Sequence, residues 1–179
     1  MIGRHRIILI AAVDRNWAIG KDNKLLYNIP IDMKYFKDKT EGNIVVYGYN
    51  TLLSFSEQNI LPNRDNIILT SKMIACGSDR MYAAHSVDEV IDTIKGFDDS
   101  RDVYICGGSS VYQQFIDMSD KACITIIDAS TERADKFFPN LFENLQWKLI
   151  DYGSPIVDNN SGLRIQFHTF VKRKKFKNK

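Results

Sequence analysis

The sequence predicts one α/β domain, with a mostly parallel central sheet of about eight strands, an antiparallel C-terminal edge and about four flanking helices. Three observations point to this fold class. The chain has 179 residues, which suits a single domain. Apolar residues make up 44% and charged residues 26%, a composition typical of folded globular proteins. Strand-like and helix-like segments alternate as far as Lys121, which indicates a parallel sheet with helices on both faces.

The expected strands are short apolar runs. Arg6–Val13 is continuously apolar after its first residue, a pattern typical of a strand buried on both faces. A turn at Asp158–Gly162 predicts that the last two strands are antiparallel. The remaining strands are expected at Asn43–Gly48, Asn66–Thr70, Arg80–Ala84, Asp102–Cys106, Cys123–Ile127, Trp147–Tyr152 and Leu163–Lys172.

Start and stop patterns predict the helices. Pro30 and Asp32 suit the first turn of a helix that ends near Thr40, because proline is tolerated there and an acidic side chain favours the helix dipole. The polar segment Asp14–Ile29, too long for a tight turn, is expected to be a loop. Further helices are expected at Tyr49–Phe55, at Val87–Lys95 behind a capping box of Ser86 and Glu89, and from Gly107–Gly108 to Phe115.

Charge and hydropathy exclude several classes of protein. Basic and acidic residues nearly cancel, at 24 and 22, so a specific nucleic-acid partner is not expected. No apolar run approaches the roughly 20 residues that cross a bilayer, and the N-terminal run resembles a strand more than a signal peptide. The domain is expected to span residues 1–171, and residues 172–179 form a basic C-terminal tail.

The cysteines argue against a metal centre or a disulfide framework. Cys76, Cys106 and Cys123 are odd in number, lie far apart and form no CxxC pair. No metal is therefore expected, and a reducing cytoplasmic location is the simplest setting.

The predicted sheet carries a common pattern at one edge, although GxGxxG and Walker-type motifs are missing. Small and hydroxyl residues near helix starts follow the strands at Ala11–Asp14, Gly48–Thr51, Thr70–Ser71 and Cys106–Ser110. Backbone N–H groups at helix starts bind phosphate, and ligands collect at the carboxyl edge of such sheets. Each segment alone is better explained as an ordinary cap or turn, but the four together favour a nucleotide-sized ligand.

Asp32 is a carboxylate on an apolar helix face, which it shares with Ile29, Tyr35 and Phe36. Desolvation there would raise its proton affinity, which is useful for donating or orienting a proton. An aspartate at a helix start is also favoured by the dipole alone, and the spacing by itself favours this structural interpretation.

The segments taken together resemble dihydrofolate reductase over about Ile7 to Val171. The matching pieces, in family order and spacing, are IILIAAVD, AIGKDNKL, IPIDMKYFK, VYGYNT, LPNRDNIILT, VYICGGSSVYQQF, ITIIDA and DKFFP. The resemblance implies the fold of that family, a monomer, and NADPH-dependent reduction of dihydrofolate to tetrahydrofolate. A same-fold reductase acting on another pyrimidine or pteridine, and a non-catalytic protein with this fold, remain alternatives.

The resemblance also assigns roles to residues. Asp32 would bind the pterin amino group and ring nitrogen, Thr125 would hydrogen-bond that carboxylate, and Tyr27 stands where the family usually has tryptophan. The implied substrate-binding residues are Ile10, Ala11, Met33, Phe36, Phe55, Leu61, Arg64, Cys106 and Tyr112, with Arg64 holding the substrate's glutamate carboxylate. The implied cofactor-binding residues are Ala12, Ile19, Gly20, Gly48, Tyr49, Asn50, Thr51, Leu69, Thr70, Ser71, Lys72, Gly107, Gly108, Ser109, Ser110 and Val111.

The chain departs from the family pattern at the cofactor end. Tyr49 stands where an arginine usually grips the adenosine 2′-phosphate, and Ser110 replaces another frequent cation. Ser71 and Lys72 could replace part of this contact with the 2′-phosphate. We therefore expect a preference for NADPH over NADH that is narrower than is usual in the family.

Overall fold

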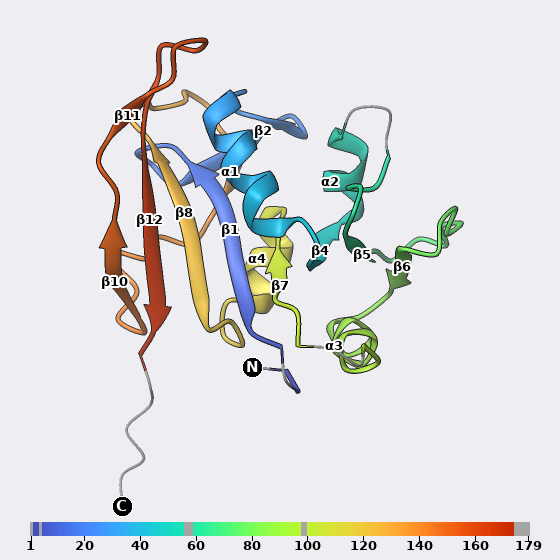
Figure 1. Cartoon of the computed structure of the whole chain (residues 1–179). Helices are drawn as coiled ribbons and strands as arrows, with labels where there is room; N and C mark the ends of the chain where they lie inside the picture. The colour runs from blue at the N-terminus through green and yellow to red at the C-terminus, as the bar shows by residue number, and fades with distance from the viewer. Residues whose placement is uncertain (1, 4, 56–58, 98–99, 174–179) are drawn as a thin grey trace, which may run out of the picture.

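The computed structural model describes residues 2–3, 5–55, 59–97 and 100–173 (Figure 1). The strand order of the central sheet is β10-β12-β8-β1-β7-β4-β5-β6, and β11 pairs with β12 at one end. Strands β8, β1, β7, β4, β5 and β6 are parallel to their neighbours in that order, whereas β12, β10 and β11 join antiparallel. The predicted α/β fold, with its antiparallel C-terminal edge, is confirmed.

Each expected strand is present, with ends that differ by a residue or two. The strands of the central sheet are β1 (Ile7–Val13), β4 (Ile44–Gly48), β5 (Asp65–Leu69), β6 (Met81–Ala84), β7 (Val103–Ile105), β8 (Lys121–Ile127), β10 (Trp147–Tyr152), β11 (Ile156–Val157) and β12 (Arg164–Lys172).

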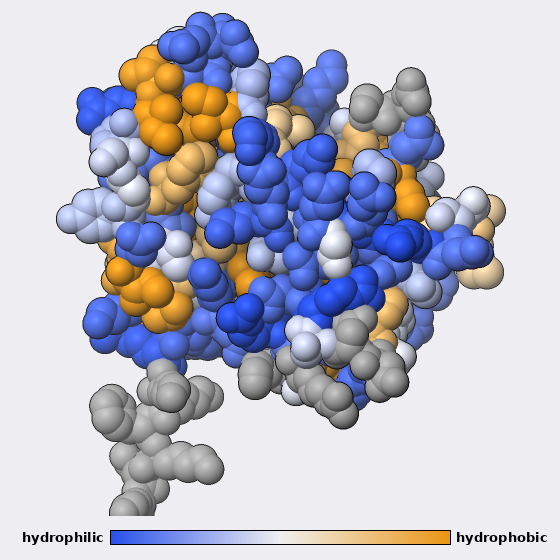
Figure 2. Space-filling model, viewed as in Figure 1, coloured by the Kyte–Doolittle hydropathy of each residue, from blue (hydrophilic) through white to orange (hydrophobic). Residues whose placement is uncertain are grey.

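The helices also lie where the sequence predicts them: α1 (Pro30–Thr40), α2 (Tyr49–Ser54), α3 (Val87–Lys95) and α4 (Ser109–Phe115). Ser86 caps α3, since its side chain accepts a hydrogen bond from the Glu89 amide at 3.1 Å. Lys34, Lys37 and Lys39 are exposed on the outer face of α1, which forms a hydrophilic region in the middle of Figure 2. The inner face of α1 therefore packs on the sheet.

A second, small sheet was not predicted. It consists of β3 (Lys24–Leu25), β2 (Ala18–Lys21) and β9 (Lys136–Phe137), in that order. The segment Asp14–Ile29, expected to be a loop, thus contains two strands. Two of these strands have only two residues each, with exposed side chains, so they leave no alternation in the sequence. β2 and β3 pair locally, and the third strand, β9, joins β2 from more than a hundred residues away in the sequence.

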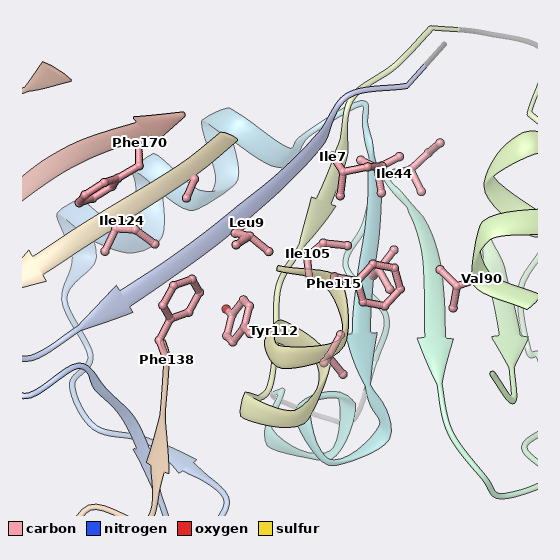
Figure 3. Packing of buried hydrophobic residues seen from close by; sticks show 14 of the residues in the cluster. Ile7, Leu9, Ile44, Val90, Ile105, Tyr112, Phe115, Ile124, Phe138 and Phe170 are labelled. Atoms are coloured by element: carbon pink, nitrogen blue, oxygen red, sulfur yellow. The ribbon is translucent and has the colours of Figure 1, made fainter. Parts of the chain in front are cut away.

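The parallel strands β1, β4, β5, β7 and β8 of the central sheet are buried on both faces, which explains their apolar sequences. Ile7 and Leu9 of β1 point toward the layer of α3 and α4, where they join a cluster with Val90 and Phe115 (Figure 3). The alternate residue Ile8 points to the other face and packs in the cluster that includes Tyr35, Phe36 and Leu52. Helices α1 and α2 thus cover one face, and α3 and α4 the other.

The C-terminal boundary is described in part. Lys172, the first residue of the expected tail, is the last residue of β12, and its Nζ donates to the backbone carbonyl of Asp117 at 2.5 Å. Residues 174–179 lie outside the described residues. Within the described part of the chain, no helix combines the length and hydropathy that a membrane span requires.

Replacing His168 in β12 with an apolar residue is expected to stabilise the fold. The side chain is buried, and neither ring nitrogen has a hydrogen-bond partner in the described part of the chain. His168→Leu is expected to raise the free energy of unfolding at pH 7 by about 1 kcal/mol, because an unsatisfied polar group leaves the core.

The same substitution has a pH signature. Burial lowers the pKa of His168 below 6.5, so the unfolded chain takes up a proton first as the pH falls. The His168 contribution to stability is therefore intact above pH 6.5 and declines below it toward the lowered pKa. Urea denaturation at pH 7 and pH 5 should show a larger advantage of His168→Leu at pH 5. An unchanged or reduced stability at both pH values contradicts this account.

Candidate active site

A cleft of about 1170 Å³ opens at the carboxyl ends of the parallel strands. Pockets for one small ligand usually measure roughly 300–1,000 Å³, so this cleft has room for two ligands side by side. The strand ends that reach it are Ala11–Ala12 of β1, Gly48 of β4, Leu69–Thr70 around the end of β5, Cys106 after β7 and Ile127 of β8. This is the edge at which the sequence predicts a ligand site.

The structure brings nearly all the predicted site residues together. All of them line the cleft except Thr125, Arg64 and Gly107. Thr125 lies beneath the wall and is 1% exposed. Gly107 precedes a glycine that does line the cleft, and Arg64 follows the lining residues Leu61 and Pro62 by two or three positions.

Asp32 and Thr125 form a pair at the apolar end of the cleft. Asp32 lies in the first turn of α1, half-buried, and a hydrogen bond joins its carboxylate to the side chain of Thr125 on β8. Burial raises the pKa of Asp32 and the hydrogen bond from Thr125 lowers it, and the effect of burial is the larger. The carboxylate therefore holds a proton more readily than an exposed aspartate does.

Apolar side chains surround Asp32. Met33 and Phe36 line the same cleft from α1, Phe55 lines it directly after α2, and Leu61 lines it before β5. Cys106 also lines this end, and burial keeps the pKa of its thiol well above the ordinary value. The thiol is therefore neutral and contributes an apolar surface.

Tyr112 of α4 fixes the floor of the cleft. Its hydroxyl donates to the backbone carbonyl of Ile10 at 2.7 Å, and the ring is buried. A Cβ at Gly107 would come within 2.9 Å of this ring, and Gly107 has a φ of +101°. Both facts require glycine at position 107.

Arg64 is held by the protein beside the cleft. It is 3% exposed; its Nε donates to Thr40 Oγ1 at 2.8 Å, and its other nitrogens donate to the carbonyls of Pro62 at 2.5 Å and Lys37 at 3.4 Å. These bonds tie the guanidinium to the last turn of α1. A guanidinium has five N–H donors, so two remain for a ligand within the described part of the chain.

The opposite end of the cleft suits phosphate groups. Gly48 and Gly108 precede the first residues of α2 and α4, and no described side chain caps either helix start. The two starts are adjacent, since the Gly48 amide donates to the Gly107 carbonyl at 2.8 Å. The peptide bond between Gly107 and Gly108 is cis. Thr51, Ser71 and the other predicted cofactor residues, apart from Gly107, line the same cleft.

Lys72 supplies the positive charge predicted at this end. Its Nζ lies 4.9 Å from the centre of the Tyr49 ring, a cation–π distance. Position 49 therefore places a cation indirectly, by supporting Lys72. The uncapped amides, the hydroxyls and this cation together fit a dinucleotide with several phosphates.

Several lining residues were missed by the sequence analysis. His85 and Ser86 follow β6, so they lie at the carboxyl end of the strand that the sequence predicts at Arg80–Ala84. Lys24 and Lys136 come from β3 and β9, which left no pattern in the sequence. The others are Ala18, Asn23, Leu25, Leu26, Ser54, Asn59, Ile60, Pro62, Gln113, Gln114 and Ile127.

Known proteins share both the sequence and the fold. The family described as dihydrofolate reductase matches residues 6–172. Dihydrofolate reductases of Bacillus subtilis (strain 168) and Staphylococcus haemolyticus are 30% and 32% identical; the matches cover 93% and 92% of this chain and 95% of each relative. A solved structure of dihydrofolate reductase from Enterococcus faecalis, complexed with NADP(H) and RAB-propyl, superposes with a TM-score of 0.83 at 29% identity, covering 94% of this chain and 97% of that one. The chain belongs to the dihydrofolate reductase family.

Proposed function

We propose that this chain catalyses the NADPH-dependent reduction of 7,8-dihydrofolate to 5,6,7,8-tetrahydrofolate, which supplies one-carbon metabolism and thymidylate synthesis. The observation that carries the proposal is Asp32, the one acidic side chain among the described residues that line the cleft. A dihydropterin presents an amino group and a ring N–H side by side, and a carboxylate accepts from both. The apolar residues around Asp32 suit the flat ring system.

The reaction divides into hydride supply and proton supply. NADPH, when bound, supplies the hydride. Asp32 orients the pterin and increases its affinity for a proton at the ring nitrogen next to the carbon that is reduced, while a water molecule delivers that proton. Thr125 keeps the carboxylate in place through its hydrogen bond. Phe36 and Phe55 line the site and exclude bulk water around the ring.

One assay separates this function from the two alternatives. NADPH oxidation is followed by absorbance with dihydrofolate, with a dihydropterin that lacks the aminobenzoylglutamate, and with pyrimidine substrates. Rapid oxidation with dihydrofolate supports the proposal. Oxidation with a pyrimidine alone favours the same-fold alternative, and binding without oxidation favours a non-catalytic protein.

The proposal includes a monomeric, cytoplasmic enzyme without a specific nucleic-acid partner. The net charge of +2 supports the last point, and the free cysteines Cys76, Cys106 and Cys123 support a reducing compartment. Light scattering on the purified protein tests the monomer.

Cofactor preference gives a prediction at position 49. Tyr49→Arg is expected to raise the ratio of kcat/KM for NADPH to that for NADH about tenfold, because a charge-assisted bond to the 2′-phosphate contributes roughly 1.5–3 kcal/mol. The gain should appear in NADPH affinity, with the hydride step nearly unchanged. Tyr49→Phe is the matched control, since it keeps the ring that supports Lys72. If the ratio does not move in Tyr49→Arg, position 49 does not face the 2′-phosphate.

A further inference from the structure

Residues 23–27, here called the covering segment, form one wall of the cleft. All five line it; the segment contains β3 (Lys24–Leu25) and leads to the residues just before α1. The preceding β2 is attached to β9 through backbone pairing of Ala18 with Phe137 and of Gly20 with Lys136. This pairing fixes the N-terminal approach to the covering segment and leaves its far end, at Tyr27, to be held by side chains.

Tyr27 is held by a residue far away in the sequence. Its hydroxyl lies 2.7 Å from Thr131 Oγ1, on the loop between β8 and β9. The ring of Tyr27 also packs against a small apolar cluster that includes Ile29, Ile127 and Ile165. Packing holds the plane of the ring, and the hydrogen bond holds the direction of its hydroxyl.

Thr131 is itself fixed by a buried carboxylate. Asp14 is 1% exposed, and its Oδ2 accepts from the Thr131 amide at 2.7 Å. Its Oδ1 accepts from the amides of Asn16 at 2.8 Å and Ala18 at 3.0 Å. One carboxylate therefore joins the chain that leads into β2 to the loop that carries Thr131. Charge-assisted bonds to three amides make this a rigid junction.

We infer that Thr131, anchored by Asp14, is a positioning residue that sets the orientation of Tyr27 at the substrate end of the cleft. The inference rests on the proposed function, because the orientation of Tyr27 matters for turnover only if the cleft binds a substrate. Neither Thr131 nor Asp14 lines the cleft. Both act through Tyr27, whose hydroxyl keeps a free lone pair or a free O–H for the substrate or a bound water.

Four variants of the full chain test whether Thr131 acts through Tyr27. Thr131→Val removes the hydroxyl at constant shape, Thr131→Ser keeps it, Tyr27→Phe removes the other partner, and the fourth combines Thr131→Val with Tyr27→Phe. Ser130→Ala controls for loss of a hydroxyl from the same loop. One hydrogen bond contributes about 1 kcal/mol, so Thr131→Val and Tyr27→Phe should each lower kcat/KM for dihydrofolate about fivefold. Thr131→Ser should restore most of the activity.

The double variant distinguishes positioning from general stabilisation. If Thr131 acts through Tyr27, Thr131→Val costs nothing further in the Tyr27→Phe background. An equal cost in both backgrounds, or wild-type kcat/KM in Thr131→Val, overturns the inference.

Amide hydrogen exchange of residues 23–27 provides a readout that does not require activity. Thr131→Val should speed this exchange, whereas Thr131→Ser and Ser130→Ala should not. If the wild-type chain fails to reduce dihydrofolate but the exchange responds as expected, the proposed function fails and the positioning role stands. If the chain is active and neither kcat/KM nor exchange responds, the positioning role fails alone.

Discussion

Asp32→Asn is expected to lower turnover with dihydrofolate at pH 7 by about 10²- to 10⁴-fold, the usual contribution of a positioned acid or base. The asparagine amide still fits the site and can still accept a hydrogen bond from Thr125. It cannot carry a negative charge, so it cannot draw a proton toward the pterin. NADPH affinity should be nearly unchanged, because the predicted phosphate-binding residues lie at the starts of α2 and α4, whereas Asp32 lies in α1. Turnover within a few-fold of the wild-type value would remove Asp32 from the mechanism.

Stability separates this chemical effect from misfolding. Burial raises the pKa of Asp32 above 3.8, so ionising this carboxylate costs the folded state more than the unfolded state. The wild-type protein therefore loses stability as the pH rises from 3.8 through the raised pKa. The side chain introduced by Asp32→Asn is neutral throughout that range. Urea denaturation should show the variant to be the more stable protein at pH 7, with an advantage that shrinks as the pH falls toward 4.

The parallel strands β1, β4, β5, β7 and β8 were predictable because each of them is buried on both faces. Runs such as Ile7–Val13 and Ile44–Gly48 have almost no solvent-facing position, so the sequence shows an uninterrupted apolar stretch. The first turn of α1 was also predictable from a local feature, because proline is tolerated at the first position of a helix and Pro30 stands there. A local pattern suffices wherever burial is a property of consecutive residues.

The second sheet and the hydrogen bond between Tyr27 and Thr131 were not predictable in this way. Strand β9 has two exposed residues, and it exists because β2 offers it backbone partners. The contact of Tyr27 with Thr131 joins positions 104 residues apart. Neither depends on a residue type that stands out in its own segment. The resemblance to a family located Tyr27, but Thr131 required the structure.

The structural role of Arg64 was also not predictable from the sequence. The resemblance predicts only its ligand role, and the structure adds a role in holding the wall of the cleft. The resemblance implies a bond to the glutamate carboxylate of the substrate. The structure shows bonds to Thr40, Pro62 and Lys37 that hold the guanidinium beside the cleft. We interpret these bonds as pre-organisation, because a fixed fork loses little freedom when a carboxylate binds to its remaining donors.

Arg64→Leu is therefore expected to raise KM for dihydrofolate by about 10- to 100-fold, because a charge-assisted pair contributes roughly 1.5–3 kcal/mol to binding. The change in kcat should be much smaller, because this pair lies away from the reacting carbon. The substitution also leaves the carbonyls of Pro62 and Lys37 without their partner, so some loss of stability is expected.

A dihydropterin that lacks the glutamate separates the effect on substrate binding from the effect on stability. Its KM should be nearly the same in wild type and variant, because it offers Arg64 no carboxylate. An equal rise of KM for both substrates would show that Arg64 only supports the wall of the cleft. Arg64→Lys tests the geometry of the bond: it keeps the charge but not the fork, and its KM for dihydrofolate should fall between those of the wild type and Arg64→Leu.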